Sequence, residues 1–62
     1  MNGDKLYLVT LPKDSTDFVI RVTEHGKVSD LGTMQDHSEL LWRSVEEVKI
    51  WADKKGGWVD EL

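Results

Sequence analysis

Hydrophobic and polar residues follow strand periodicity in the first half of this chain and helix periodicity in the second half. Residues 17–24 alternate, which predicts a strand with one buried face. The side chains on that apolar face are Phe18, Ile20 and Val22. In residues 5–11, both the odd-numbered and the even-numbered positions carry apolar residues. This is typical of a strand at the centre of a sheet with both faces at least partly covered. Pro12 ends this segment, and a loop of about five residues is expected to follow.

A hairpin is predicted where His25 and Gly26 separate residues 17–24 from a third strand-like segment. Glycine adopts positive φ at little cost, which suits a two-residue turn at this point. Such a turn places Glu24 opposite Lys27 and, further along the strands, Arg21 opposite Asp30. Cross-strand pairing therefore explains these charges without a functional role.

The clearest helix signal lies in residues 44–57. Ser44 followed by Glu47 predicts a capping box, in which each side chain bonds the backbone N–H of the other residue. Gly56, preceded by two lysines, predicts the end of the helix. Apolar residues recur at helical spacing between these limits and define one buried face. They are Val45, Val48, Trp51 and Ala52.

Residues 39–43 fit two predictions. They form either a short strand that leads into the Ser44 cap, which the capping box favours, or the first turn of a longer helix capped at Ser38. Residues 32–38 have neither period and predict a loop. Residues 58–62 are expected to add a short last strand beside the sheet.

Together these elements predict one α+β domain over residues 1–62. It contains a three- or four-stranded, mainly antiparallel sheet packed by one C-terminal amphipathic helix, with a short closing strand. This architecture is similar to that of small host-modulating proteins of bacterial viruses, a resemblance that rests on no motif and assigns no residue a role. The predicted core consists of Leu6, Leu8, Phe18, Ile20, Val22, Val45, Val48, Trp51 and Ala52.

Composition narrows the functional classes. The chain has no cysteine and no apolar run long enough to span a membrane, from which we expect a cytoplasmic protein without membrane association. Its net charge of -4 argues against direct binding of nucleic acid or anionic lipid.

Candidate chemistry is sparse. His37 lies between Asp36 and Glu39, but the chain offers no cysteine and no serine in a nucleophile motif, so these are expected to be solvated loop residues. A domain of this size is also expected to leave little room for a ligand pocket. We therefore predict no catalytic residue, no cofactor and no metal, and a protein that is not an enzyme.

Protein–protein contact is the predicted function, as an adaptor or inhibitor. Ile50 lies on the polar side of the helix, about 140° from Val45, and Trp42 lies outside the helix stripe, so both are candidate anchors. The acidic residues predicted to form a rim that guides a basic partner are Asp36, Glu39, Glu46 and Glu47.

Other interpretations compete with this prediction. Trp42 could belong to the core, and Ile50 could be covered by a second copy of the chain in a homodimer. The chain could also be a nucleic-acid-associated regulatory module, or an acidic mimic of DNA that acts on a DNA-binding protein.

Overall fold

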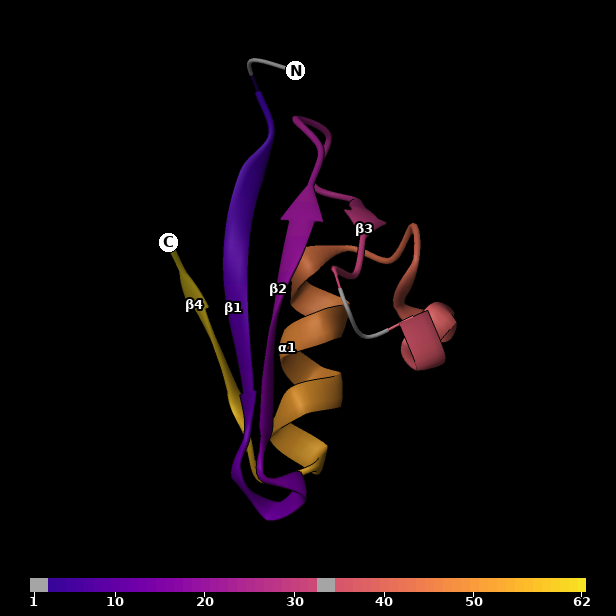
Figure 1. The fold of residues 1–62 in the computed structure, drawn as a ribbon. Coiled ribbons are helices and arrows are strands. Elements are labelled where there is room, and N and C mark those ends of the chain that lie inside the picture. Colours follow the sequence, from indigo (N-terminus) through magenta and orange to yellow (C-terminus); the bar gives the residue numbers. More distant parts are fainter. Residues whose placement is uncertain (1–2, 33–34) are drawn as a thin grey trace.

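The computed structural model describes residues 3–32 and 35–62, without the side chains of Gln35 and Asp36. Within this part of the chain, four strands form one antiparallel sheet in the order β3-β2-β1-β4, and helix α1 packs on one face of it (Figure 1). This α+β architecture confirms the predicted fold class, the central place of β1 and the closing strand. The elements are β1 (Lys5–Leu11), η1 (Pro12–Asp14), β2 (Thr16–Val22), β3 (Val28–Asp30), η2 (Gln35–Leu40), α1 (Val45–Lys54) and β4 (Trp58–Glu61), of which η1 and η2 are 3₁₀ helices.

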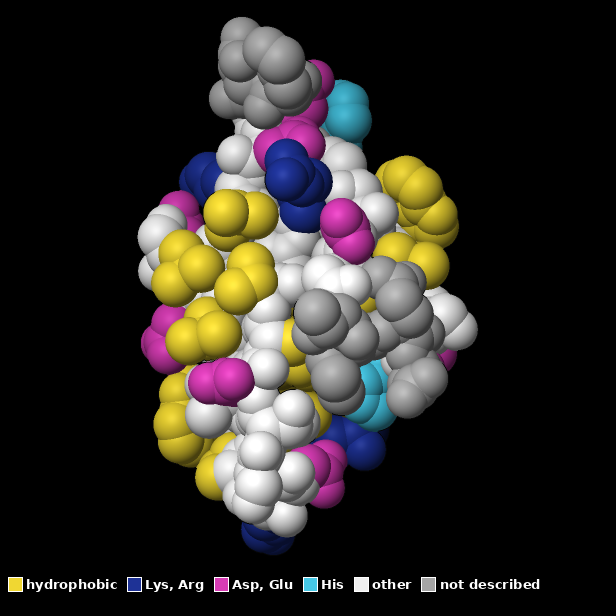
Figure 2. All heavy atoms as spheres, viewed as in Figure 1, with side chains coloured by type: hydrophobic (Ala, Val, Ile, Leu, Met, Phe, Trp, Pro, Cys, Tyr) yellow, Lys and Arg dark blue, Asp and Glu magenta, His cyan; other side chains and the backbone are white. Residues whose placement is uncertain are grey.

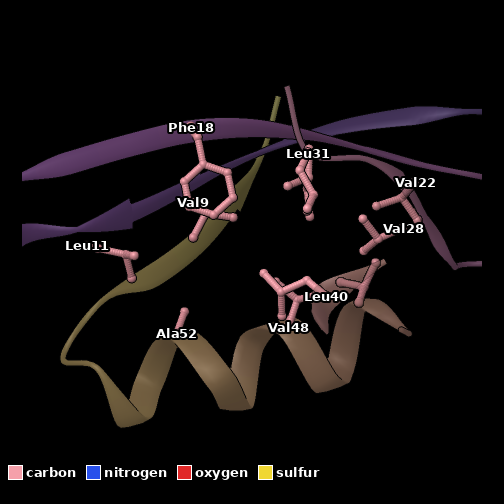
Figure 3. Close-up of a cluster of buried hydrophobic side chains, with 11 residues drawn as sticks. Val9, Leu11, Phe18, Val22, Val28, Leu31, Leu40, Val48 and Ala52 are labelled. Atoms are coloured by element: carbon pink, nitrogen blue, oxygen red, sulfur yellow. The ribbon is translucent and has the colours of Figure 1, made fainter. Parts of the chain in front are cut away.

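The hydrophobic core lies between α1 and the sheet face turned toward it (Figure 3). Half-buried side chains from β1, β4 and α1, including Trp51, pack around it. The predicted buried face of β2 and most of the predicted helix stripe are confirmed. The buried residues are Val9, Leu11, Phe18, Ile20, Val22, Val28, Leu31, Leu40, Val45, Val48 and Ala52.

The prediction that Leu6 and Leu8 belong to the core is wrong. Strand β1 pairs with β2 so that Val9 lies opposite Phe18 and Leu8 lies opposite Val19. Residues directly opposite each other in an antiparallel pair point to the same face, so the odd-numbered residues of β1 face α1. Leu6 is 43% exposed and Leu8 is half-buried, both on the other face.

The turn between β2 and β3 is longer than predicted. The Thr23 amide donates a hydrogen bond to the Lys27 carbonyl at 2.8 Å, which leaves three residues in the loop. Gly26 has a φ of 80°, as expected when a hairpin loop of this length ends in the left-handed region. The predicted pairing of Glu24 with Lys27 is therefore wrong. A register shift in the β2–β3 pair restores the predicted partners Arg21 and Asp30.

Residues 39–43 form neither of the predicted structures. Helix η2 begins inside the segment 32–38 that was expected to be a loop, and it ends at Leu40. Trp42 then adopts a φ of 66°, which is incompatible with a continuous strand or helix. Its amide donates a hydrogen bond to the Val28 carbonyl at 2.7 Å, so the segment is held against β3 by a contact that is distant in sequence.

Both ends of α1 follow the sequence prediction. Ser44 and Glu47 form the reciprocal capping box at the start. At the other end, Gly56 has a φ of 76°, and the Gly57 amide donates to the Ala52 carbonyl at 2.9 Å. This is the Schellman arrangement, which satisfies helix carbonyls and turns the chain into β4.

Candidate protein-binding site

An open groove runs beside α1, where the C-terminal part of η2 meets the helix. Its volume is about 390 Å³, so the expectation that the domain leaves little room for a pocket is wrong. The groove exists because η2 lies beside the helix rather than continuing it. Its lining residues are Glu39, Leu40, Arg43, Glu47, Ile50, Trp51 and Lys54.

An aromatic cluster surrounds Trp51, one of the residues that line the groove. The Trp51 ring lies edge-on to Phe18, with ring centres 6.5 Å apart, and edge-on to His37 at 5.1 Å. His37 also stacks on Phe18 at 6.0 Å, so it is a packed residue and not the solvated loop residue that the sequence predicted. The Lys55 ammonium lies 5.1 Å from the centre of the Trp51 ring, an attractive cation–π position. These contacts hold Trp51 in one orientation.

Ile50 provides the exposed apolar wall of the groove. It is 57% exposed, as expected from its position on the polar side of α1, about 140° from Val45. Leu40 and Trp51 line the same groove. Ile50 is therefore part of a continuous apolar surface rather than an isolated exposed residue.

Charges of both signs surround the apolar surface. Glu39 and Glu47 contribute acids, and Arg43 and Lys54 contribute bases. The Arg43 guanidinium lies 3.5 Å from the Glu47 carboxylate. That carboxylate also accepts the Ser44 amide at 3.0 Å, and this hydrogen bond is the main reason why the pKa of Glu47 is lowered. Glu47 is thus first a helix-capping residue, and only its remaining acceptor capacity is open to a partner.

The structure brings together only part of the predicted site. Ile50, Glu39 and Glu47 share the groove. Glu46 lines a separate hollow on the other side of α1, together with residues of β1 and the β2–β3 turn. Trp42 is 65% exposed and so is not a core residue, but it is not among the residues that line the groove. The side chain of Asp36 lies outside the described part of the chain.

Sequence reasoning missed a second apolar surface, on the sheet face that α1 does not cover. Leu6, Leu8, Val19 and Trp58 lie on this face, and Figure 2 shows hydrophobic side chains gathered along β1 and β4. The prediction that Leu6 and Leu8 belong to the core removes both residues from this face. The available signal was the apolar character of residues 5–11 at both parities, since a single helix covers only one face of a sheet.

Among the described residues, no group of three or more histidine, aspartate or glutamate side chains is placed to hold a metal ion. No helix in residues 3–32 and 35–62 has the length and apolar character needed to cross a membrane.

Comparisons with models of protein families, with curated proteins and with solved structures find no match.

Proposed function

We propose that this protein is a non-enzymatic binding module, of the adaptor or inhibitor type, that takes a segment of another protein into the groove beside α1. The segment inserts an apolar side chain between Ile50 and the ring of Trp51. No cofactor takes part. The observation that carries the proposal is the 57% exposure of Ile50 on a groove whose other apolar members are held in place.

The residues that line the groove are of the kinds found at protein–protein interfaces. Binding energy at protein interfaces concentrates in a few aromatic and aliphatic anchors surrounded by a polar rim. Here Ile50, Leu40 and Trp51 form the centre, and charged side chains surround them. The aromatic contacts of Trp51 already order its side chain in the free protein, so less side-chain entropy is lost on binding.

A basic partner is favoured by the overall charge. The chain carries twelve acidic and eight basic residues, so its long-range field attracts positive surfaces. Within the groove, the Glu39 carboxylate lies 3.7 Å from the His37 imidazole, whereas Glu47 is engaged by both Ser44 and Arg43, so Glu39 retains more acceptor capacity for such a partner. Rim charges of this kind mainly raise the association rate and fix orientation.

Trp42 is proposed as a second anchor outside the groove. A non-glycine residue at a φ of 66° is destabilised by roughly 1–2 kcal/mol relative to a right-handed conformation. The indole does not recover this energy by packing in the free protein, because Trp42 is 65% exposed. A large aromatic side chain at a strained, exposed position fits a role in binding.

The experiment compares Ile50→Glu with Lys49→Glu. The control places the same new side chain on the neighbouring exposed position of α1, with a larger change in charge. Each variant is used as bait in lysate, candidates are identified by mass spectrometry, and each candidate is purified and titrated into the ¹⁵N-labelled protein. We expect a partner that binds wild type and Lys49→Glu but not Ile50→Glu, and that shifts the signals of Leu40, Arg43 and the Trp51 indole.

Two results would contradict the proposal. One is a purified partner that binds a folded Ile50→Glu variant as tightly as wild type. The other is a partner whose signal shifts map to the open sheet face instead of the groove. Salt separates this proposal from the nucleic-acid alternative, because phosphate contacts weaken steeply with salt and an apolar contact does not.

A further inference from the structure

The sheet face opposite α1 carries exposed apolar side chains from three adjacent strands, β4, β1 and β2. Leu6 is 43% exposed, Val19 38% and Trp58 51%. Leu62 follows β4 and stays in register, since its amide donates to the Leu6 carbonyl at 2.9 Å. Residues 3–32 and 35–62 provide no second layer over this face, which is unusual for an apolar sheet surface.

Strand register arranges this face in three rows. In the middle row, Leu8 lies between Val19 on β2 and Asp60 on β4. In the row toward the start of β1, Leu6 lies opposite Arg21. In the third row, Thr10 lies between two residues: Asp17 on β2 and Trp58 on β4. Strand β2 therefore carries a base at one end of the face and an acid at the other, on either side of Val19.

We propose that this face binds a second copy of the same chain, face to face, about a two-fold axis that crosses the strands along the middle row. Such an axis exchanges the two outer rows. It brings Leu8 and Val19 onto their own counterparts and places Arg21 of each copy over Asp17 of the other. Trp58 of each copy then lies over Leu62 of the other copy. Self-complementarity of this kind is what a two-fold interface requires.

Local charge complementarity is the reason to choose a second copy over another protein, and the net charge of -4 on each copy opposes this association and contributes to its weakness. The proposed axis forms two opposite-charge contacts from one Arg21 and one Asp17 in each chain. Arg21 is also 3.9 Å from the Asp4 carboxylate and lies opposite Asp30 in the sheet, but its side chain is exposed and retains donors for a further acid. Asp60 meets its own counterpart at the exposed β4 edge, where solvent screens the repulsion between the two carboxylates and where the remaining repulsion makes the dimer weaker.

Edge-to-edge pairing of two β4 strands fits less well. Strand β4 ends in Asp60 and Glu61, so an antiparallel pair of such edges would bring acids of both copies close together. Like charges at a strand edge are a known defence against this kind of pairing. The self-association therefore uses the face and not the edge.

The proposed dimer is expected to be weak. With a rise of about 3.4 Å per residue and strands about 4.8 Å apart, the three rows cover an area on the order of 300 Å² per copy. Standard interfaces bury about 800 Å² per partner, so this contact belongs to the small, weak and transient class of interfaces. The inference does not depend on the proposed function of the groove.

Sedimentation equilibrium tests the dimer. Between about 10 µM and 1 mM, the weight-average mass of the wild type should rise from 7.1 kDa toward twice that value. Val19→Lys should weaken association at least about tenfold, because two lysines would meet on the axis. Ile50→Glu, on the opposite side of the molecule, should associate like wild type. Circular dichroism of each variant establishes that the fold is retained.

A charge-exchange experiment tests the specific axis. Arg21→Glu alone and Asp17→Lys alone should each fail to self-associate, because each places like charges in contact. An equimolar mixture of the two should form a heterodimer as strong as the wild-type dimer or stronger, because every contact is again between opposite charges. The proposal is overturned if wild type stays monomeric at about 1 mM, if Val19→Lys associates like wild type, if Ile50→Glu abolishes association, or if the mixture stays monomeric.

Discussion

The Glu47 amide donates a hydrogen bond to the Ser44 hydroxyl oxygen at 3.2 Å, and the Ser44 amide donates one to the Glu47 carboxylate at 3.0 Å. This reciprocal pair begins α1 and also shapes the groove, since Glu47 is one of its lining residues. Stability of the helix and charge of the proposed binding site therefore depend on the same carboxylate.

Acid should weaken the fold through this pair. The Ser44 backbone hydrogen bond holds the pKa of Glu47 below its ordinary value of 4.5, so the folded state binds the proton less readily than the unfolded state. The stabilisation is complete above the unfolded pKa and is lost as the pH falls through the folded one. Urea unfolding of wild type and Glu47→Gln should show a stability difference that is constant near neutral pH and shrinks below 4.5. A difference independent of pH would contradict this assignment.

Removal of the hydroxyl provides a second measurement on the same cap. Ser44→Ala should lower the free energy of unfolding by about 1 kcal/mol, the usual effect of losing an N-cap. Ser44→Asp is the matched control, because aspartate is an equally good N-cap and should retain most of the stability. Equal losses in both variants would show that the cap is not the source of the effect.

Trp51 should matter most for stability among the three tryptophans. It packs on Phe18 and His37, whereas Trp42 and Trp58 are 65% and 51% exposed. Trp51→Ala should destabilise the domain by about 3 kcal/mol, a large part of the total expected for 62 residues. Ile50→Ala, at the adjacent exposed position, should change stability by less than about 0.5 kcal/mol. Thermal and urea unfolding measure both.

Trp42 should be better replaced by glycine than by alanine. Its φ of 66° strains any residue with a Cβ atom, and glycine adopts this conformation freely. Trp42→Gly should therefore be about 1 kcal/mol more stable than Trp42→Ala, measured by urea unfolding. Equal stability of the two variants would mean that the segment relaxes away from the left-handed conformation.

Two glycines separate the effect of a steric clash from the effect of backbone conformation. A Cβ atom at Gly57 would collide with the Thr10 carbonyl oxygen, where β4 passes close to β1. A Cβ atom at Gly26 would meet no atom within 4 Å, so only its φ of 80° opposes substitution. Gly57→Ala should destabilise by about 3 kcal/mol and Gly26→Ala by about 1 kcal/mol. The reverse order would show that β4 does not approach β1 this closely in solution.

The limits of α1 could be predicted from sequence because they depend on near neighbours. Ser44 and Glu47 are three residues apart, and Gly56 ends the helix through its own φ. The buried face of β2 was predictable for a similar reason, since alternation leaves one choice of apolar face. The exposure of Ile50 follows from its angle on the helix.

Sequence by itself thus determined the fold class, the helix with both its ends, and the exposed position of Ile50. Tertiary structure decided which face of β1 is buried, because residues 5–11 are apolar at both parities and only the pairing of Val9 with Phe18 selects between them. It also decided the path of residues 39–43, through the hydrogen bond from Trp42 to Val28. The open sheet face depends on which face of β1 is buried, and the groove depends on the path of residues 39–43. Both are set by contacts between residues distant in sequence, which local periodicity cannot predict.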